Sequence, residues 1–143
     1  MSVLSIIIPS YNEGEGILEA ANVVQAVMKE AYICYEIIFV DDGSKDNTWE
    51  QITSLAKVSE NIKGIKFSKN FGKESAMLAG LSHAKGDACV IMDCDLQHPP
   101  QTIIKMYEVW LEGGVDVVEG VKESRRDESL LYKRRMSKLA CKW

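Results

Sequence analysis

The chain alternates between short apolar runs and longer stretches in which apolar residues recur at helical spacing. The apolar runs are rich in Val and Ile and are bounded by Gly, Pro, Asn or Asp, which is typical of buried strands. They lie at 3–8, 36–40, 62–67, 87–92 and 115–119. The stretches with helical spacing predict amphipathic helices that pack on a sheet through one face. They lie at 17–31, 49–56, 77–84 and 103–111.

Strands that alternate with helices in this way predict a doubly wound α/β fold. We expect a mostly parallel sheet with helices on both faces, because parallel neighbours need crossover helices. The 143 residues, with 46% apolar and 27% charged content, have an ordinary globular composition and can build one such core. Ligands bind at the carboxyl ends of the strands in open sheets of this kind, so we expect functional residues there.

Composition disfavours several function classes. The formal net charge of −4 gives no support for a nucleic-acid partner. The cysteines are scattered without a Cys-x-x-Cys pair, which argues against a disulfide framework and against structural zinc. No apolar run approaches the ~20 residues of a spanning helix, so we expect the chain as given to be soluble or peripheral.

The strongest chemical signal follows the apolar run at 87–92. Asp93 and Asp95 come directly after it, and side chains two positions apart on an extended segment point the same way. Proteins usually hold Mg²⁺ and Mn²⁺ through one or two carboxylates, with substrate phosphates and water completing the coordination. Asp-x-Asp also arises by chance, and a loop Asp often only caps the next helix, so the pair alone leaves both interpretations open.

Other polar clusters follow the other predicted strands and should share one rim with these carboxylates. They are Asn12 with Glu13, Asp41 with Asp42, and residues 70–73. The Asp41 and Asp42 pair could form an Asx turn and cap the next helix. Alternatively, one carboxylate accepts hydrogen bonds from a base or ribose while its neighbour organises the loop. Lys73 lies where a loop meets a helix N-terminus, which favours an anion, although surface lysines are usually just solvated.

The segment 14–19 follows a strand and opens a helix, so it can be compared with a dinucleotide fingerprint. Its third glycine position holds Glu19, which would obstruct close packing of helix on strand. We therefore favour an ordinary helix start over Rossmann cofactor binding.

The end of the chain, from residue 123 to 143, is strongly basic and also carries apolar residues, and we predict an amphipathic helical segment there. It could be a solvated basic face or a surface that lies on an anionic membrane. We therefore divide the chain into a domain at 1–122 and this segment at 123–143.

Taken together, four motifs resemble those of glycosyltransferase family 2. They are 7–13 (Ile-Ile-Pro-Ser-Tyr-Asn-Glu), 40–44 (Val-Asp-Asp-Gly-Ser), 70–73 (Asn-Phe-Gly-Lys) and 93–100 (Asp-Cys-Asp-Leu-Gln-His-Pro-Pro). More narrowly, the chain resembles the polyprenyl-phosphate sugar transferases, the group of dolichyl-phosphate mannose synthase and bactoprenol glucosyltransferase. Gly120-Val121-Lys122 is similar to that group's Gly-Val-Arg stretch, with Lys122 in place of the usual Arg. The resemblance covers essentially the whole chain and implies the GT-A fold, a Rossmann-like nucleotide-sugar-binding domain.

The resemblance also implies roles for individual residues. Asp93 and Asp95 would be the catalytic pair and, with Gln97, would hold Mg²⁺ or Mn²⁺ against the donor diphosphate. The residues implied for nucleotide binding are Pro9, Tyr11, Asn12, Glu13, Asp41, Asp42 and Lys73. The residues implied near the donor or acceptor phosphate are Lys122, Arg125, Arg134, Arg135 and Ser137.

The implied activity is inverting transfer of a hexose from a UDP-sugar or GDP-mannose to a polyprenyl phosphate at the cytoplasmic face of the cell membrane. Its partners would be the sugar nucleotide, the lipid phosphate and the membrane surface, and a homo-oligomer of the full-length protein stays open. Members of this group continue past the basic segment, so we interpret the chain as a truncated catalytic domain. The alternatives are a family 2 enzyme with a hydroxyl acceptor in polysaccharide or lipopolysaccharide synthesis, a non-catalytic nucleotide-sugar-binding module, and a membrane-surface module.

Overall fold

The computed structural model describes residues 2–124 and 127–135, with side chains as far as residue 120. The chain forms two compact units, of which the first ends at His98 and the second begins at Pro99. The predicted division after residue 122 falls inside a strand of the second unit. Among the described helices, none combines the length and the apolar character that crossing a bilayer requires.

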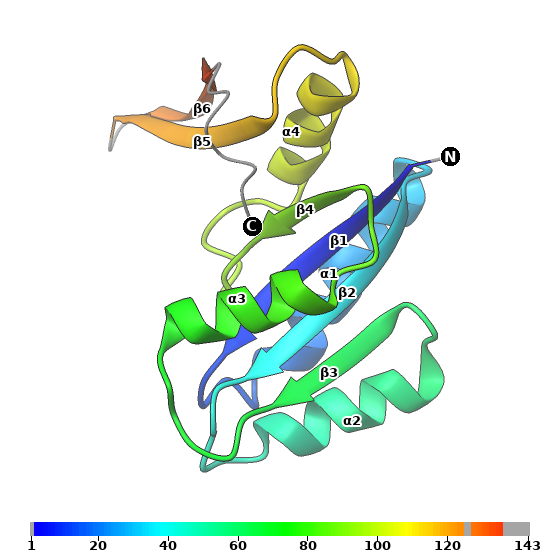
Figure 1. Cartoon of the computed structure of the whole chain (residues 1–143), viewed down its shortest axis with the longest axis vertical. Helices are drawn as coiled ribbons and strands as arrows, with labels where there is room; N and C mark the ends of the chain where they lie inside the picture. The colour runs from blue at the N-terminus through cyan, green and yellow to red at the C-terminus, as the bar shows by residue number, and fades with distance from the viewer. Residues whose placement is uncertain (1, 125–126, 136–143) are drawn as a thin grey trace. The chain divides into compact units, whose positions relative to one another are not determined.

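The first unit is a parallel sheet of four strands with helices between them (Figure 1). The strands are β1 (Val3–Ser10), β2 (Cys34–Asp41), β3 (Ile62–Lys66) and β4 (Ala88–Ile91). The helices are α1 (Ile17–Glu30), α2 (Thr48–Val58) and α3 (Lys73–His83). The strand order is β3-β2-β1-β4, so the chain moves one way along the sheet through α1 and α2 and crosses back through α3.

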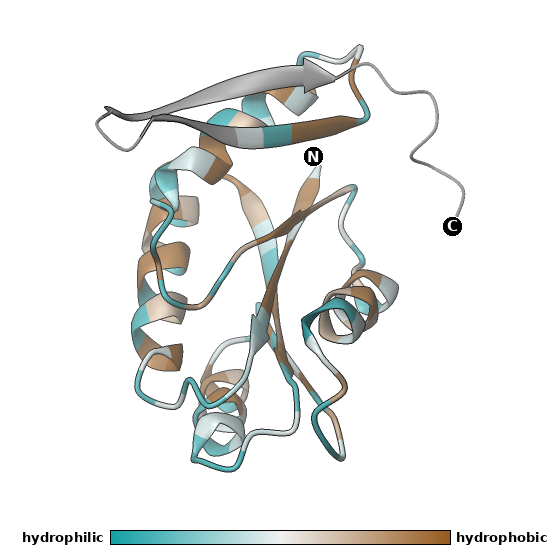
Figure 2. Cartoon of the chain, turned by 90° about the vertical axis from the view of Figure 1, so that its left-hand side faces the viewer, coloured by the Kyte–Doolittle hydropathy of each residue, from teal (hydrophilic) through white to brown (hydrophobic). Residues whose placement is uncertain are grey.

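Right-handed crossovers therefore place α1 and α2 on one face of the sheet and α3 on the other. Figure 2 shows the strands of this unit edge-on with helices on both sides. The predicted parallel sheet with helices on both faces is confirmed for this unit.

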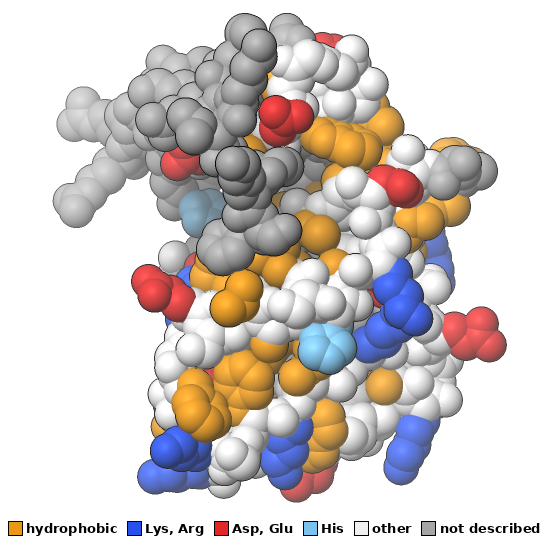
Figure 3. Space-filling model, viewed as in Figure 1, with side chains coloured by type: hydrophobic (Ala, Val, Ile, Leu, Met, Phe, Trp, Pro, Cys, Tyr) orange, Lys and Arg blue, Asp and Glu red, His pale blue; other side chains and the backbone are white. Residues whose placement is uncertain are grey.

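Strand register explains the packing of α3. Ile38 and Val40 of β2 form a buried cluster with Ala76 of α3. Ile7 pairs with Ile38 and faces the same way, and a Cβ built on Gly80 would lie only 2.3 Å from its Cγ2 atom. The absence of a side chain at Gly80 therefore lets α3 lie close to the sheet. The outer surface of α3 keeps large apolar side chains half exposed, among the hydrophobic groups on the face seen in Figure 3.

The opposite face packs against α2 and α1. Gly64 of β3 pairs with Phe39 of β2, and a Cβ on Gly64 would lie 2.7 Å from the Ile52 side chain of α2. Helix α1 buries the apolar positions that the periodicity predicts: Ile17, Ala20, Ala21, Val24, Val27 and Met28. The core is therefore continuous on both sides of β1 and β2, whose residues are almost all buried.

A buried polar network lies at the amino end of the sheet, away from the candidate site. Glu36 is 6% exposed and accepts hydrogen bonds from the Ser5 hydroxyl (2.5 Å), the Lys85 amide (2.6 Å) and the Lys63 ammonium (2.5 Å). The Gly86 amide in turn donates to the Ser5 hydroxyl oxygen (2.8 Å). The network ties the turn between α3 and β4 to β1 and β2.

The second unit contains α4 (Gln101–Leu111), β5 (Val117–Ser124) and β6 (Asp127–Arg135). The strand predicted at 115–119 forms as part of β5, but its expected place in the parallel sheet is wrong, because β5 pairs antiparallel with β6 in a separate two-stranded sheet. A second prediction is also wrong. The segment 127–135, predicted as helical, is a strand. Short apolar runs such as Leu130 to Tyr132 suit both structures, and pairing with β5 decides between them.

Candidate functional site

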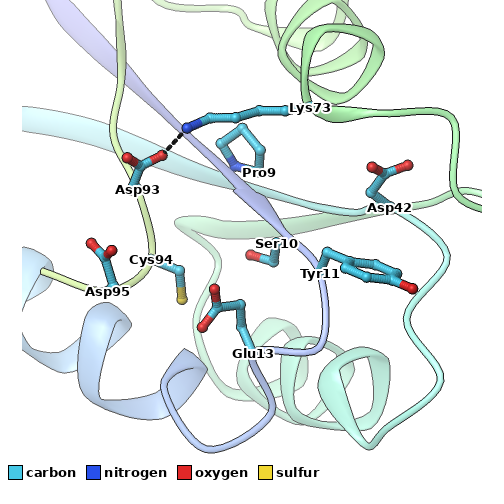
Figure 4. Close-up of a pocket in the computed structure, with 9 residues that line it drawn as sticks. All are labelled: Pro9, Ser10, Tyr11, Glu13, Asp42, Lys73, Asp93, Cys94 and Asp95. Carbon is cyan, nitrogen blue, oxygen red and sulfur yellow. Dashed lines mark hydrogen bonds and ion pairs between the residues drawn. The ribbon is translucent and has the colours of Figure 1, made fainter.

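The carboxyl ends of β1, β2 and β4 meet the start of α3 around a pocket with a volume of about 280 Å³. It is lined by Pro9, Ser10, Tyr11, Glu13, Asp42, Lys73, Asp93, Cys94 and Asp95 (Figure 4). The backbone ladder continues just past two strands, because the Met92 amide donates to the Ile7 carbonyl (3.0 Å) and the Asp42 amide to the Ser10 carbonyl (2.9 Å). These bonds fix the points from which the acidic side chains project.

Asp93 and Asp95 both line the pocket, but Cys94 between them lines it too, so this turn after β4 does not continue the alternation of side chains along the strand. The ammonium of Lys73 forms an ion pair with Asp93 Oδ1, reaching from the start of α3 across the pocket (Figure 4). Asp95 Oδ1 accepts a hydrogen bond from the backbone amide of Gln97 (3.1 Å). The Gln97 side chain is not among the lining groups, so its predicted metal contact stays a prediction.

The donor set decides which metal chemistry fits. Within the described residues, no three His, Cys, Asp or Glu side chains converge closely enough to hold a metal by themselves. The Asp93 and Asp95 carboxylates, of which Asp93 is already paired with a cationic side chain, fit a hard divalent ion that completes its coordination with substrate oxygens. The pocket therefore suits Mg²⁺ or Mn²⁺ bound together with a diphosphate.

Negative charge accumulates on this side of the pocket. Burial raises the pKa of Glu13 above its ordinary value of 4.5, and the carboxylates of Asp95, Asp46 and Asp93 raise it further. Burial likewise raises the pKa of the Cys94 thiol to about 12, with Glu13 the next contributor. Cys94 is therefore a protonated, uncharged group near neutral pH, and a bound cation would relieve the repulsion among the acids.

Asp42 organises the loop that carries Lys73. Its carboxylate accepts hydrogen bonds from the amides of Phe71 (2.8 Å) and Gly72 (3.1 Å), and it is only 4% exposed. Gly72 has a φ of +102°, which a residue with a side chain rarely adopts. The carboxylate and the glycine together fix the backbone from which α3 and Lys73 begin.

Asp41 is fully buried and does not line the pocket. Its Oδ1 accepts a hydrogen bond from the Ser44 amide (3.0 Å), whereas its Oδ2 has no partner among the described residues. A buried carboxylate oxygen normally accepts a hydrogen bond, so this atom has unused acceptor capacity. The two neighbouring carboxylates therefore differ in role. Asp42 holds the loop before α3, whereas Asp41 is buried with one oxygen that has no partner among the described residues.

The loops after β1 and β2 are joined by side chains. The Asn12 Oδ1 atom accepts from the Lys45 amide (2.9 Å), and the Asn12 amide donates to the Ser44 hydroxyl (2.9 Å). The Glu13 amide donates to Thr48 Oγ1 (2.9 Å). Asn12, predicted to bind nucleotide, is not among the lining residues and instead braces the loop that presents Tyr11, which is 42% exposed.

Sequence reasoning missed three groups. Ser10 and Cys94 line the pocket between predicted site residues, and only their positions beside Pro9 and Asp93 could have indicated them. Thr48 directly precedes the helix predicted at 49–56, and its role in bracing Glu13 depends on how the loops meet.

Three of the predicted phosphate and acceptor residues lie in strands of the second unit. Lys122 is in β5 and Arg134 and Arg135 are in β6, where the backbone alone is described. Arg125 and Ser137 lie outside the described residues. Their roles stay predictions.

The chain is similar to known glycosyltransferases. The model of the family "Glycosyl transferase family 2" matches residues 5–142. The uncharacterized glycosyltransferase YkcC of Bacillus subtilis is 40% identical over 129 residues, covering 90% of this chain and 40% of that protein. An undecaprenyl-phosphate 4-deoxy-4-formamido-L-arabinose transferase of Yersinia pestis is 38% identical over 137 residues, covering 95% of this chain and 41% of that protein.

The solved structures show the same fold. The mannosyltransferase PcManGT from Pyrobaculum calidifontis, solved in complex with GDP-Man and Mn²⁺, has a TM-score of 0.69 and 24% identity, covering 87% of this chain and 36% of that one. The chain thus spans about two fifths of the length of the relatives it matches. The predicted GT-A fold is confirmed, and the chain belongs to glycosyltransferase family 2.

Proposed function

We propose that the chain carries the donor site of an inverting, metal-dependent glycosyltransferase. It transfers a hexose from a UDP-sugar or GDP-mannose to a polyprenyl phosphate at the cytoplasmic face of the cell membrane. The observation that carries the proposal is that one pocket is lined by Asp93, Asp95, Lys73 and Tyr11. These groups match the metal, phosphate and base of a sugar nucleotide.

Each part of the donor has a suitable group. The half-exposed Tyr11 offers its ring as a stacking surface for a base, and Asp42, which lines the pocket, is the acceptor for a base or ribose donor. Asp93 and Asp95, with Gln97 beside them, would hold Mg²⁺ or Mn²⁺. When bound, the ion supplies charge neutralisation for the departing diphosphate. Lys73 is the cationic side chain that can add a hydrogen bond to a phosphate oxygen.

The acceptor follows from proton chemistry. A lipid phosphate is already ionised near neutral pH and attacks the anomeric carbon without a general base, whereas a hydroxyl acceptor needs one. The Yersinia pestis relative is named as an undecaprenyl-phosphate transferase, which supports a lipid phosphate here. PcManGT, in complex with GDP-Man and Mn²⁺, supports a metal-bound sugar nucleotide as the donor. The phosphate and acceptor residues of the second unit, from Lys122 onward, are part of this proposal.

A transfer assay tests the proposal. The intact gene product is incubated with Mn²⁺, undecaprenyl phosphate in detergent, and radiolabelled UDP-hexoses or GDP-mannose. We expect label in the organic phase that mild acid releases as free sugar. The Asp95→Asn variant should lose this product, while the exposed-surface variant Glu60→Gln should keep it. Label that enters only a polysaccharide would favour the hydroxyl acceptor, and no transfer from any donor would reject the enzyme.

A further inference from the structure

Lys73 is the one cationic side chain among the described residues that line the pocket. Its ammonium is bound to Asp93 Oδ1, an oxygen that the proposed function assigns to a divalent cation. Asp93 Oδ1 cannot bind the Lys73 ammonium and a metal ion equally well at the same time, because the two cations repel each other at contact distance. The structure therefore contains a competition between a resident ammonium and an incoming metal.

The backbone at Lys73 is anchored, whereas its ammonium group is exposed to solvent. Asp42 accepts hydrogen bonds from the amides of Phe71 and Gly72, and these bonds anchor the backbone directly before Lys73. Its side chain is 59% exposed and Asp93 is 45% exposed, so water can replace either partner when the ion pair opens. An exposed ion pair of this kind contributes about 1 kcal/mol or less and exchanges readily.

A nucleoside diphosphate supplies the alternative partner for the ammonium. It brings negative charge into the pocket together with the metal, and charge-assisted hydrogen bonds to phosphate are stronger than an exposed ion pair. Metal binding alone releases Lys73 with no partner, whereas metal and diphosphate together satisfy Asp93, the cation and the ammonium.

We propose that Lys73 is an exchangeable counter-ion that couples metal binding to donor binding, which rests on the proposed donor site. In the empty pocket it neutralises Asp93 and weakens capture of a free metal ion. In the loaded pocket it transfers to the diphosphate and strengthens capture of the metal and nucleotide together. Lys73 is in this sense a positioning residue with opposite effects on the two binding steps.

The opposite effects give a sharp test with the 143-residue chain. Lys73→Met keeps most of the apolar stem and removes the charge. We expect Mn²⁺ alone to bind about 2- to 5-fold more tightly, as the loss of a weak competing ion pair implies. We expect UDP or GDP, in saturating Mn²⁺, to bind about 10-fold more weakly or worse, as the loss of a charge-assisted hydrogen bond implies. Mn²⁺ binding is measured by electron paramagnetic resonance and nucleotide binding by calorimetry.

Two variants control the experiment. Lys73→Arg keeps the charge and should bind Mn²⁺ and nucleotide nearly as the unaltered chain does. Lys69→Met removes a lysine of the same loop that lies over the Phe71 ring, 5.2 Å from its centroid, and is not a lining group. It should change neither binding step. Circular dichroism confirms that each variant is folded.

The proposal is overturned if Lys73→Met leaves the Mn²⁺ affinity unchanged or lowers it, or if its nucleotide affinity equals that of the unaltered chain. Failure of the proposed function has a different signature. In that case the unaltered chain binds neither UDP nor GDP in the presence of Mn²⁺, while the comparison of Mn²⁺ alone still tests the competition at Asp93.

Discussion

Replacing Glu36 with Gln should weaken the fold and remove much of its sensitivity to acid. Burial acts to raise the pKa of the Glu36 carboxyl, but hydrogen bonds from Lys63, Ser5 and the Lys85 amide outweigh it and lower the pKa from 4.5 to about 2. The folded protein therefore binds the proton less readily than the unfolded chain does. The Glu36 carboxylate stabilises the fold above pH 4.5, and this contribution is lost as the pH falls from 4.5 through about 2.

The magnitude follows from the shift. One pKa unit corresponds to about 1.4 kcal/mol, so lowering the pKa from 4.5 to about 2 is worth roughly 3 kcal/mol. The Lys63 side chain is 43% exposed, and solvent screening brings the expected contribution nearer to about 2 kcal/mol. Glu36→Gln should lower the free energy of unfolding by about this amount near neutral pH, because an amide cannot pair with Lys63 as a carboxylate does.

Urea unfolding followed by circular dichroism measures the effect. The unaltered chain, Glu36→Gln and the exposed-surface control Glu60→Gln are compared near neutral pH and at a pH of about 3. We expect the difference in unfolding free energy between the unaltered chain and Glu36→Gln to become smaller at the lower pH. Glu60→Gln should have the same unfolding free energy as the unaltered chain at both pH values. Equal stability of Glu36→Gln and the unaltered chain near neutral pH would refute the reasoning, as would a gap that stays constant as the pH falls.

Further predictions concern packing, the loop and the thiols. Gly80→Ala should lower the free energy of unfolding by about 1 to 3 kcal/mol, because its Cβ would lie 2.3 Å from Ile7 Cγ2. Ser82→Ala, on the exposed side of α3, should change it little. Equal urea midpoints for the two variants would contradict this prediction. Asp42→Ala should speed hydrogen exchange at the Phe71 and Gly72 amides about 10-fold or more by mass spectrometry, and unchanged protection there would count against the role of Asp42 in the loop. Cys94, whose thiol pKa burial raises to about 12, should stay unmodified by iodoacetamide near neutral pH while the exposed Cys34 reacts; peptide mapping that finds both equally alkylated would disprove the burial argument.

The sequence predicted the parts of the fold that depend on local pattern. The runs at 3–8 and 36–40 became β1 and β2, and Asp93 and Asp95 lie just after β4 because they directly follow the apolar run at 87–92. Parallel pairing then brought the strand ends together, so the convergence of polar loops was also predictable.

The remaining features depend on contacts between distant segments. Glu36 sits in an apolar run, and only the register of β1 beside β2 reveals Ser5 as its partner. The face of α3 was difficult to predict, because it buries the small residues Ala76 and Gly80 and leaves Leu81 41% exposed.

The division of labour between Asp41 and Asp42 likewise depends on how the loop before α3 folds back over the end of β2. The strand β6 was missed because its partner β5 decides its conformation.

The central claim is that the pocket beyond β1, β2 and β4 binds a nucleoside diphosphate through a divalent cation held by Asp93 and Asp95. The most direct measurement is calorimetric titration of UDP and GDP into the chain with and without Mn²⁺, repeated for Asp95→Asn and for Glu60→Gln. We predict that at least one nucleotide binds at least about 10-fold more tightly with Mn²⁺, that Asp95→Asn removes this gain, and that Glu60→Gln keeps it. Nucleotide affinity that is the same with and without Mn²⁺, or the same in Asp95→Asn as in the unaltered chain, would contradict the claim.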